Sequence, residues 1–525
     1  MILLSAGLAL RLVLIARPID DLITLTLNDD AFYYFKIAQH ILAGHGASFD
    51  GVNLTNGFHP LWLLFSVLSF WLFGGQGDFP IHALLALSAL ADVLTGFVVY
   101  KIVSGITGKV AGALLALAIW CLHLRLIFIA INGMETALNA LLVALSLLLF
   151  FRLERDSPTR ARPYLLTGIV WGLTLLARTD NIMLIVILLG GLLLRRHEVR
   201  RVAAASVTAT ALILPWTIWS LLTFGTIAQA SGWAGPMVMR AEFVRQHSGN
   251  DLLPALIQFM AGALFYGFTR LYLLFPIRAA WADGGWLLTT AAFGIWLWRR
   301  YDMRSREMAS QPAFLPAVIC LTWISVFISA HVLFRWGTRP YYAYSIAPAI
   351  YVVTGIVATW LTTRALTRPE RAGLYALGGV LFVLGIIANI DFLGRPHNDH
   401  QREMLKAAYW LRDNTAPEAV IGSYNAGLLA YRSSRRVVNL DGVINNAAYE
   451  AIASETMAEY VARSKIDYIA DFVLNGPDDL FGAYYWKAKP DYRVVYDSDM
   501  SGYDFRYYQA RDYVVVALSR RAQSR

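Results

Sequence analysis

The feature that most constrains the fold of this chain is a series of apolar segments, many about 20 residues long, separated by short polar loops. About 20 apolar residues form a helix long enough to cross the hydrocarbon core of a bilayer. Hydrophobic residues make up 57% of the chain and charged residues 15%, whereas soluble domains have roughly a quarter charged residues. The sequence therefore predicts a multi-pass membrane protein.

Eleven segments are predicted to be transmembrane helices. They lie at 2–19, 81–100, 110–131, 137–151, 164–177, 182–194, 202–223, 285–298, 313–333, 341–363 and 373–390. The first has no small-residue cleavage site, so we expect a retained helix rather than a signal peptide. The thirteen residues "LWLLFSVLSFWLF" at 61–73 are too few for an ordinary span. We expect them to form a short helix at the outer surface or a re-entrant helix.

The distribution of Lys and Arg predicts which loops face the cytoplasm. These residues are concentrated in the short loops 101–109, 152–162, 195–201, 299–306 and 364–371, and they are sparse in the longer loops between the other spans. Loops rich in Lys and Arg remain on the cytoplasmic side. The sequence thus predicts a plasma-membrane protein with a cytoplasmic N-terminus and its C-terminus outside. Because the net charge of +9 comes from these loops, it does not indicate nucleic-acid binding.

The composition becomes polar after residue 390, which divides the chain into two predicted domains. Residues 1–390 would form an all-α membrane domain with a first outer loop at 20–60, and residues 391–525 an extracytoplasmic α/β domain. In the second domain we expect an amphipathic helix near 399–413 and helical stretches within 446–464. Strand-like runs occur at "AVIGSY", "RVVNL", "DYIADFV", "YRVVY" and "YVVVAL". The domain contains no cysteine, so it does not depend on disulfides.

This topology brings many polar and aromatic residues to the outer ends of the spans. An acidic pair follows the first helix, a histidine precedes the short helix at 61–73, and three outer loops supply further groups. The predicted site residues are Asp29, Asp30, His59, Glu135, Arg178, Asp180, Arg335, Arg339, Tyr341 and Tyr342. Acids, bases and aromatic rings at a membrane–water boundary suit a substrate with a charged head and an apolar tail.

Structural roles are an alternative for several of these residues. Either acid of the pair could cap a helix, because acidic residues favour the first turn, and Glu135 could cap the fourth span. Arg178 and Asp180 could pair with each other at a helix end, and Arg339 could anchor a loop at the interface. Within the spans, Asp92 is close enough in depth to Arg125 for a structural ion pair, although intramembrane charges are often functional.

The chain resembles the GT-C superfamily, membrane glycosyltransferases that use polyprenyl-phosphate-linked sugars. The resemblance rests on the acidic pair in "NDDAFYYF", the first outer loop with its short helix, Glu135 between spans three and four, and the stretch "RPYYAYSIAPA". It is strongest to the branch of protein O-mannosyltransferases and lipid A aminoarabinose transferases. It implies a catalytic carboxylate in the acidic pair and substrate contacts in the other outer loops. His59 occupies the position of a lysine in the aminoarabinose enzymes.

The chemistry of such a transfer gives these residues separate roles. The attacking hydroxyl needs a base, for which we expect Asp29, with Asp30 as its partner. The departing lipid phosphate needs cations, which Arg339, Arg335 and His59 would supply. The expected partners are thus a polyprenyl-phosphate sugar donor, a glycan, lipid or protein acceptor, and the bilayer. A divalent metal is possible, but two acids alone do not establish one, because hard cations require several oxygen ligands. A transporter or flippase of lipid-linked sugars is the alternative, although it would have more charge near mid-membrane.

Overall fold

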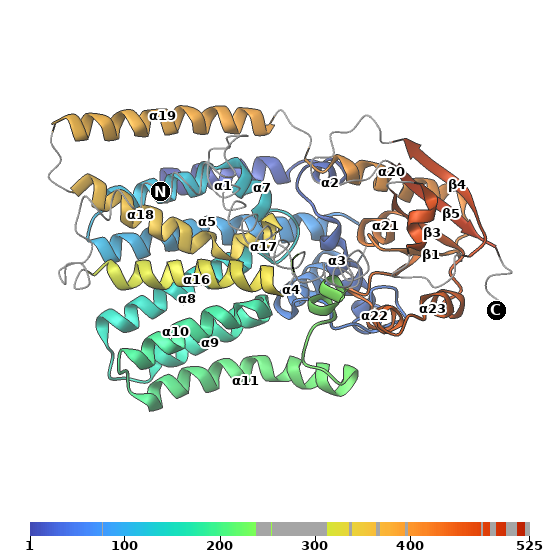
Figure 1. Ribbon diagram of the computed structural model, residues 1–525, viewed down its shortest axis with the longest axis horizontal. Helices are drawn as coiled ribbons and strands as arrows, with labels where there is room; N and C mark the ends of the chain where they lie inside the picture. Colours follow the sequence, from blue (N-terminus) through green and yellow to red (C-terminus); the bar gives the residue numbers. More distant parts are fainter. Residues whose placement is uncertain are drawn as a thin grey trace.

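The structure is a computed structural model, and it shows a bundle of long helices beside a smaller α/β domain (Figure 1). It describes residues 1–75, 77–237, 254, 312–334, 339–363, 368–393, 397–473, 476–482, 490–499 and 512–519. The predicted span 285–298 and Arg335 lie outside the described residues. Figure 1 shows a helical part, which contains the N-terminus, and an α/β part, which contains the last described strand.

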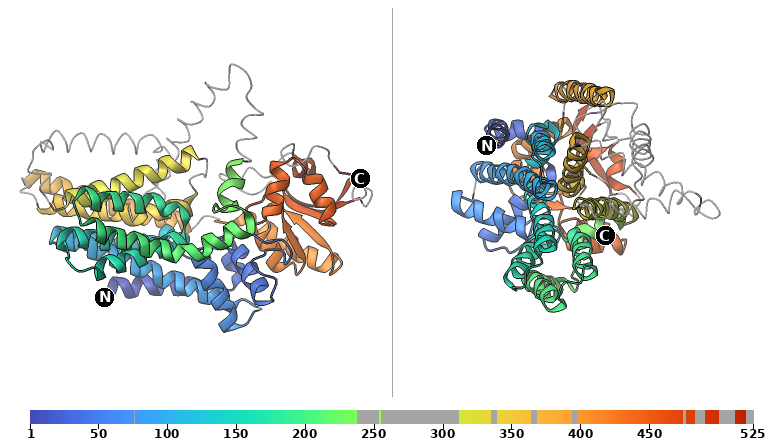
Figure 2. Two further views of the ribbon diagram at one scale, coloured as in Figure 1. Left: turned by 90° about the horizontal axis from the view of Figure 1, so that it is seen from below. Right: turned by 90° about the vertical axis from the view of Figure 1, so that its left-hand side faces the viewer.

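The apolar segments form helices, most of them long, that lie side by side (Figure 2). They are α1 Ile2–Ile15, α5 Phe79–Thr107, α6 Ala111–Leu122, α7 Leu124–Ala130, α8 Thr136–Asp156, α9 Arg162–Ala177, α10 Ile182–Leu194, α11 Val199–Phe224, α16 Phe314–Leu333, α18 Ala347–Thr363 and α19 Arg368–Leu393. Among the described residues, 5 helices are long and apolar enough to cross a membrane alone, or up to 7 if two bent helix pairs each count as one span. The total of eleven spans stays a prediction.

Two predicted spans contain a break. The first, 2–19, breaks after α1, and its last residue begins α2 (Ile19–Leu25), whose axis differs from that of α1 by 113°. Pro18 is the N-cap of α2, and a proline restricts the residue before it to extended conformations, which ends the preceding helix. The second breaks between α6 and α7 at 62°. Here His123 has an extended backbone and lies between the two helices.

A buried ion pair inside the bundle differs from the sequence expectation. Asp92 on α5 accepts hydrogen bonds from Arg11 on α1, with Nε–Oδ2 2.8 Å and Nη2–Oδ2 2.5 Å. The hydroxyl of Tyr344 donates to the other carboxylate oxygen. The expected pairing of Asp92 with Arg125 is therefore wrong, and the guanidinium of Arg125 lies over the Phe392 ring at 5.4 Å instead. The partner of Asp92 is decided by the packing of α1 against α5. The depth of a residue in the membrane does not by itself identify its partner.

Short helices lie where the bundle meets the α/β domain (Figure 1). Besides α2, they are α3 (Asp29–Leu42) and α4 (Pro60–Phe73). The predicted short helix at 61–73 is confirmed as α4, with Pro60 in its first turn, where the missing N–H costs no hydrogen bond. Its neighbour α3 packs against α4 on one side and against the α/β domain on the other (Figure 1).

The α/β domain contains a five-stranded mixed sheet in the order β2-β1-β3-β5-β4. Strands β2, β1 and β3 are parallel, and β5 runs antiparallel to β3 and β4. The strands are β1 Val420–Ser423, β2 Arg436–Asn439, β3 Tyr468–Val473, β4 Tyr492–Asp499 and β5 Asp512–Leu518, and the helices are α20 Asp399–Asn414, α21 Gly427–Arg432, α22 Asn446–Ala453 and α23 Met457–Arg463. The five strand-like runs, the helix near 399–413 and the helical stretches within 446–464 are confirmed.

The remaining short helical elements lie in the connections between these parts. They are η1 Thr179–Asn181, α17 Pro340–Ala343, η4 Tyr344–Ile346 and η5 Pro477–Phe481.

Polar contacts fix the α/β domain on the segment 20–60. Asn446, at the start of α22, donates from its amide to the Asn56 Oδ1 at 3.0 Å. The Gln401 side chain donates to the carbonyl of Leu27 at 2.7 Å. At Gly57 the backbones approach so closely that an added Cβ would lie 1.9 Å from the Val443 carbonyl oxygen. The segment 20–60 and the α/β domain are thus packed directly against each other.

We expect Gly57→Ala to loosen this contact. The new methyl group has to displace backbone, not a flexible side chain, and overpacking of this kind costs about 1–3 kcal/mol. Hydrogen exchange of the purified protein should become faster around Val443. Gly75→Ala is the matched control, because a Cβ there meets nothing within 4 Å. Equal exchange in both variants would contradict the prediction.

Candidate active site

The acidic pair lies at the start of α3 and faces two different parts of the protein. Asn28 is the N-cap, and Asp29 and Asp30 occupy the first turn, where negative charge interacts favourably with the helix end. Successive helix residues are rotated by about 100°, whereas residues four apart share a face. Asp29 therefore shares a face with Tyr33, and Asp30 shares one with Tyr34.

Asp29 faces the α/β domain. Its Oδ1 accepts a hydrogen bond from the Leu428 amide at 2.6 Å, and its Oδ2 accepts one from the Gly427 amide at 3.2 Å. On the same face, the hydroxyl of Tyr33 lies 3.5 Å from the Tyr424 carbonyl oxygen. Burial raises the pKa of Asp29 to about 7, against the opposing effect of these amide hydrogen bonds. Asp29 is thus held by α21, which begins nearly 400 residues later in the chain.

Asp30 faces the helical bundle. Its Oδ2 accepts a hydrogen bond from the Tyr341 hydroxyl at 3.0 Å and lies 3.8 Å from the Arg339 guanidinium. Arg339 also donates to the Tyr341 hydroxyl at 2.8 Å. The side chains of Asp30 and Arg339 are 31% and 60% exposed, so a ligand can reach both. The structure therefore brings one acid, one cation and one phenol together at an accessible point.

A second group of predicted residues forms a buried ionic network. Arg178 donates to Glu135 at 2.8 Å and to Asp180 at 2.8 Å. Glu135 has no exposed side-chain surface, and Arg178 has 7%. The expected structural pairing of Arg178 with Asp180 is present, and Glu135 joins it as a second acid. Two acids around one guanidinium fix its orientation, because its planar group donates in several directions.

Aromatic and histidine side chains surround this network. The Tyr34 hydroxyl donates to Glu135 at 3.1 Å, and the His59 Nε2 lies 3.6 Å from the same carboxylate. The Arg178 guanidinium lies 4.8 Å from the centre of the Tyr342 ring, a cation–π geometry. Through Tyr34, the helix that carries Asp30 is therefore joined directly to the Glu135 network.

Sequence reasoning missed three acidic or basic groups beside these residues. His331 lies 3.3 Å from Asp180, and its position in an apolar span could have indicated it. Asp441 and Asp471 come from the α/β domain. Burial raises the pKa of Asp441 to about 7, and the nearby charge of Asp30 contributes. Nothing local in the sequence connects either acid with the pair on α3.

The described residues do not form a recognisable metal site. No group of three or more His, Cys, Asp or Glu side chains among them is arranged to hold a metal ion. Asp30 instead pairs with Arg339, and Asp29 with backbone amides. The arrangement suits proton transfer and anion binding by the protein's own groups.

Comparisons with known proteins agree with this architecture. Residues 59–219 match the family described as dolichyl-phosphate-mannose-protein mannosyltransferase, and residues 388–524 match a domain family of unknown function. No curated protein matches the chain by sequence.

Two solved structures share the fold at low sequence identity. One is ArnT from Cupriavidus metallidurans bound to undecaprenyl phosphate, at 15% identity and a TM-score of 0.54, with 97% of each chain covered. The other is the Archaeoglobus fulgidus oligosaccharyltransferase in its apo form, at 14% identity and a TM-score of 0.54, with 89% of this chain and 69% of that chain covered. The family match over residues 59–219 and the shared fold confirm the resemblance to the GT-C superfamily that was found in the sequence.

Proposed function

We propose that the chain is a membrane glycosyltransferase that moves a sugar from a polyprenyl-phosphate-linked donor to a hydroxyl group of an extracytoplasmic acceptor. The observation that carries the proposal is the contact of Asp30 with Tyr341 and Arg339 at an accessible point. This contact places a base for the acceptor, Asp30, beside a cation for the donor phosphate, Arg339. One structural relative is described as bound to undecaprenyl phosphate, which supports a lipid phosphate as the donor's leaving group.

In the proposed reaction the acceptor hydroxyl attacks the anomeric carbon of the sugar. The new carbon–oxygen bond forms as the bond to phosphate breaks, and the lipid phosphate leaves with the bonding electrons. Asp30 accepts the hydroxyl proton, a contribution typically worth about 10²–10⁴-fold in rate. Arg339 stabilises the charge that develops on the phosphate.

The hydrogen bonds support Asp30 for the role that the sequence suggested for Asp29. Both oxygens of Asp29 accept backbone hydrogen bonds from the α/β domain, so we propose that Asp29 holds and orients the start of α3. Asp30, by contrast, has a carboxylate oxygen 3.8 Å from the Arg339 guanidinium. A donor phosphate that competes for Arg339 would withdraw that cation from Asp30 and leave the acid available for the proton.

The Glu135 network is proposed to position the donor side of the site. Tyr342 lies against Arg178 and is adjacent in the chain to Tyr341, which contacts Asp30. His59 lies against Glu135. Arg178, Asp180, Glu135, His59 and Tyr342 therefore remain substrate-binding candidates, acting through the orientation of the loop that carries Arg339.

The first test measures donor binding with undecaprenyl phosphate as the probe. Arg339→Ala should weaken binding at least about tenfold, because a charge-assisted contact to phosphate is lost. Arg463→Ala removes an exposed arginine of α23 and should leave binding unchanged. Unaltered affinity in Arg339→Ala would remove the donor role from this residue.

The proposed membrane orientation is tested by labelling intact cells. Glu418→Cys, in the α/β domain, should react with an impermeant thiol reagent, and Glu198→Cys, in a loop rich in arginine, should react only after lysis. Both positions are exposed, and the native Cys121 and Cys320 are buried, so background labelling should be low. The reverse pattern would invert the topology.

A further inference from the structure

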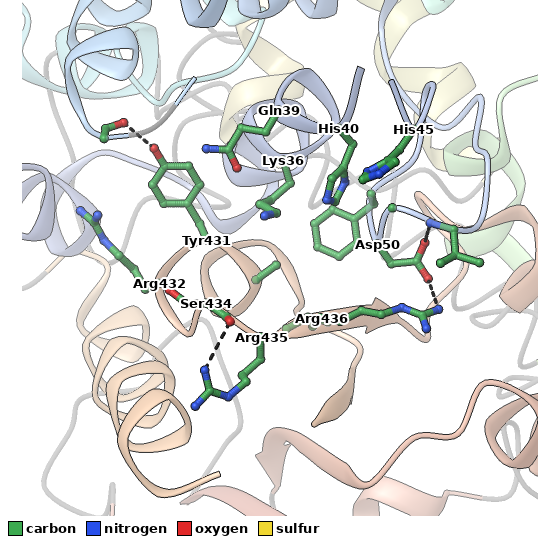
Figure 3. A pocket seen from close by; sticks show the side chains of 16 residues that line it. Lys36, Gln39, His40, His45, Asp50, Tyr431, Arg432, Ser434, Arg435 and Arg436 are labelled. Carbon is green, nitrogen blue, oxygen red and sulfur yellow. Dashed lines mark hydrogen bonds and ion pairs between the residues drawn. The ribbon is translucent and has the colours of Figure 1, made fainter. Parts of the chain in front are cut away.

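A cavity of about 580 Å³ lies between α3 and the α/β domain, away from the contacts of Asp30. One wall comes from α3 and the loop that follows it, and the other comes from α21 and β2 (Figure 3). Its polar lining is mainly basic and includes Lys36, His40, His45, Arg432, Arg435 and Arg436, with Asp50 as the acid among them. None of the predicted site residues lines it.

The arginines of this cavity already have partners. Arg432 forms ion pairs with Asp78 at 2.9 Å and with Asp20 at 2.7 Å. Arg436 pairs with Asp50 at 3.3 Å. Arg435 donates to the backbone carbonyls of Arg412 and Thr415 and to the Thr415 hydroxyl. The pair of Arg436 with Asp50 joins the two walls, and the contacts of all three arginines leave little of their charge for a ligand.

Lys36 differs from the arginines. No described residue forms a hydrogen bond or an ion pair with its ammonium group, and its burial alone lowers its pKa. Figure 3 shows the side chain directed into the cavity, between Tyr431 and His40. The His40 ring is fixed by a 2.9 Å contact between its Nδ1 and the Ser48 carbonyl oxygen. A partly buried ammonium without a counter-ion is unfavourable, and a bound anion would remove that cost.

We propose that this cavity is a binding site for an oxyanion, a phosphate or carboxylate group, with Lys36 as its central cation. His40 and Gln39, from the same helix, line the space beside the ammonium. The α/β domain closes the opposite side through Tyr431 and Arg436. The site therefore exists only when the two parts of the chain are packed together.

The position of Lys36 suggests which substrate carries the anion. Lys36 lies six residues after Asp30 on one helix, which corresponds to about 9 Å along the axis. We assign an acidic group bound there to the acceptor, since the donor phosphate is assigned to Arg339. This last step rests on the proposed function, whereas the presence of an oxyanion site does not.

The test follows the acylation of Lys36 by mass spectrometry, with the whole protein in phosphatidylcholine nanodiscs. Inorganic phosphate, compared with chloride at equal ionic strength, should slow labelling of Lys36 several-fold and leave the exposed Lys465 unchanged. The protection should persist in Arg339→Ala, which separates this cavity from the donor site. Because no turnover is measured, the result stands apart from the success or failure of the transfer reaction.

A second measurement uses variants of the lysine. A ligand that binds the folded state raises its thermal stability by mass action, so phosphate should raise the melting temperature of the wild type and of Lys36→Arg. Lys36→Met should fold, because it removes an uncompensated charge, but it should lose the phosphate-dependent rise. Lys465→Met is the matched control and should keep it.

A separate arm distinguishes a soluble anion from a lipid head group. Protection by phosphate in neutral nanodiscs assigns a soluble anion, and protection by phosphatidylglycerol nanodiscs without phosphate assigns a lipid head group. Either outcome supports an oxyanion site at Lys36. Absence of protection in both arms, or equal protection of Lys465, would overturn the proposal.

Discussion

Asp30→Asn is expected to reduce sugar transfer by about 10²–10⁴-fold, the usual contribution of a positioned general base. The amide keeps the shape of the carboxylate and can still accept the hydrogen bond from Tyr341, but it cannot take the acceptor's proton. Binding of undecaprenyl phosphate should persist. Transfer would be measured as sugar incorporation in membranes that supply the native donor and acceptor.

Asp29→Asn is the matched control for this prediction. It changes the neighbouring residue in the same way, but its carboxylate contacts the Gly427 and Leu428 amides rather than Arg339. We expect a smaller loss of transfer, together with faster hydrogen exchange at the start of α21. If Asp29→Asn is inactive and Asp30→Asn is active, the general base is Asp29 and not Asp30. Full activity in both variants would remove the acidic pair from the mechanism.

Arg178→Met is expected to produce the largest loss of stability. It leaves Glu135 and Asp180 without their shared cation, although their side chains are only 0% and 9% exposed. Removing one partner of a buried ion pair costs about 3–5 kcal/mol. Thermal unfolding of the detergent-solubilised protein measures the effect.

Two further variants test whether the loss comes from buried charge. Arg155→Met removes the arginine of an exposed pair with Asp156 and should leave the melting temperature unchanged, because exposed pairs contribute little. Arg178→Met combined with Glu135→Gln and Asp180→Asn removes the orphaned charges and should recover part of the stability. A triple variant no more stable than Arg178→Met would indicate that packing of the arginine, not charge, explains the loss.

Much of the secondary structure could be predicted from the sequence, because it depends on neighbours in the chain. The apolar segment after Pro60, the amphipathic pattern at α20 and the short apolar runs of β1 to β5 each determine an element through local periodicity. The bends at Pro18 and His123 were missed. Hydropathy measures only the apolar length of a segment, and a bent pair of helices has the same apolar length as a straight one.

The acidic pair could also be identified from the sequence, but the division of labour within it could not. Residue type and place in the chain made Asp29 and Asp30 conspicuous. Their directions depend on where α3 begins, since one residue rotates a side chain by about 100°. The partners then come from far away: Leu428 for Asp29 and Tyr341 for Asp30.

Only the tertiary structure decided which charges meet. Asp92 pairs with Arg11 and not Arg125, and His331 approaches Asp180 across the bundle. Lys36, an ordinary lysine of an amphipathic helix in the sequence, acquires a cavity only because α21 and β2 pack against α3. Hydrophobic patterning determines which segments are buried, but it does not determine which buried segments are neighbours. The packing of whole helices decides which polar groups pair. The site forms because that packing brings its residues together.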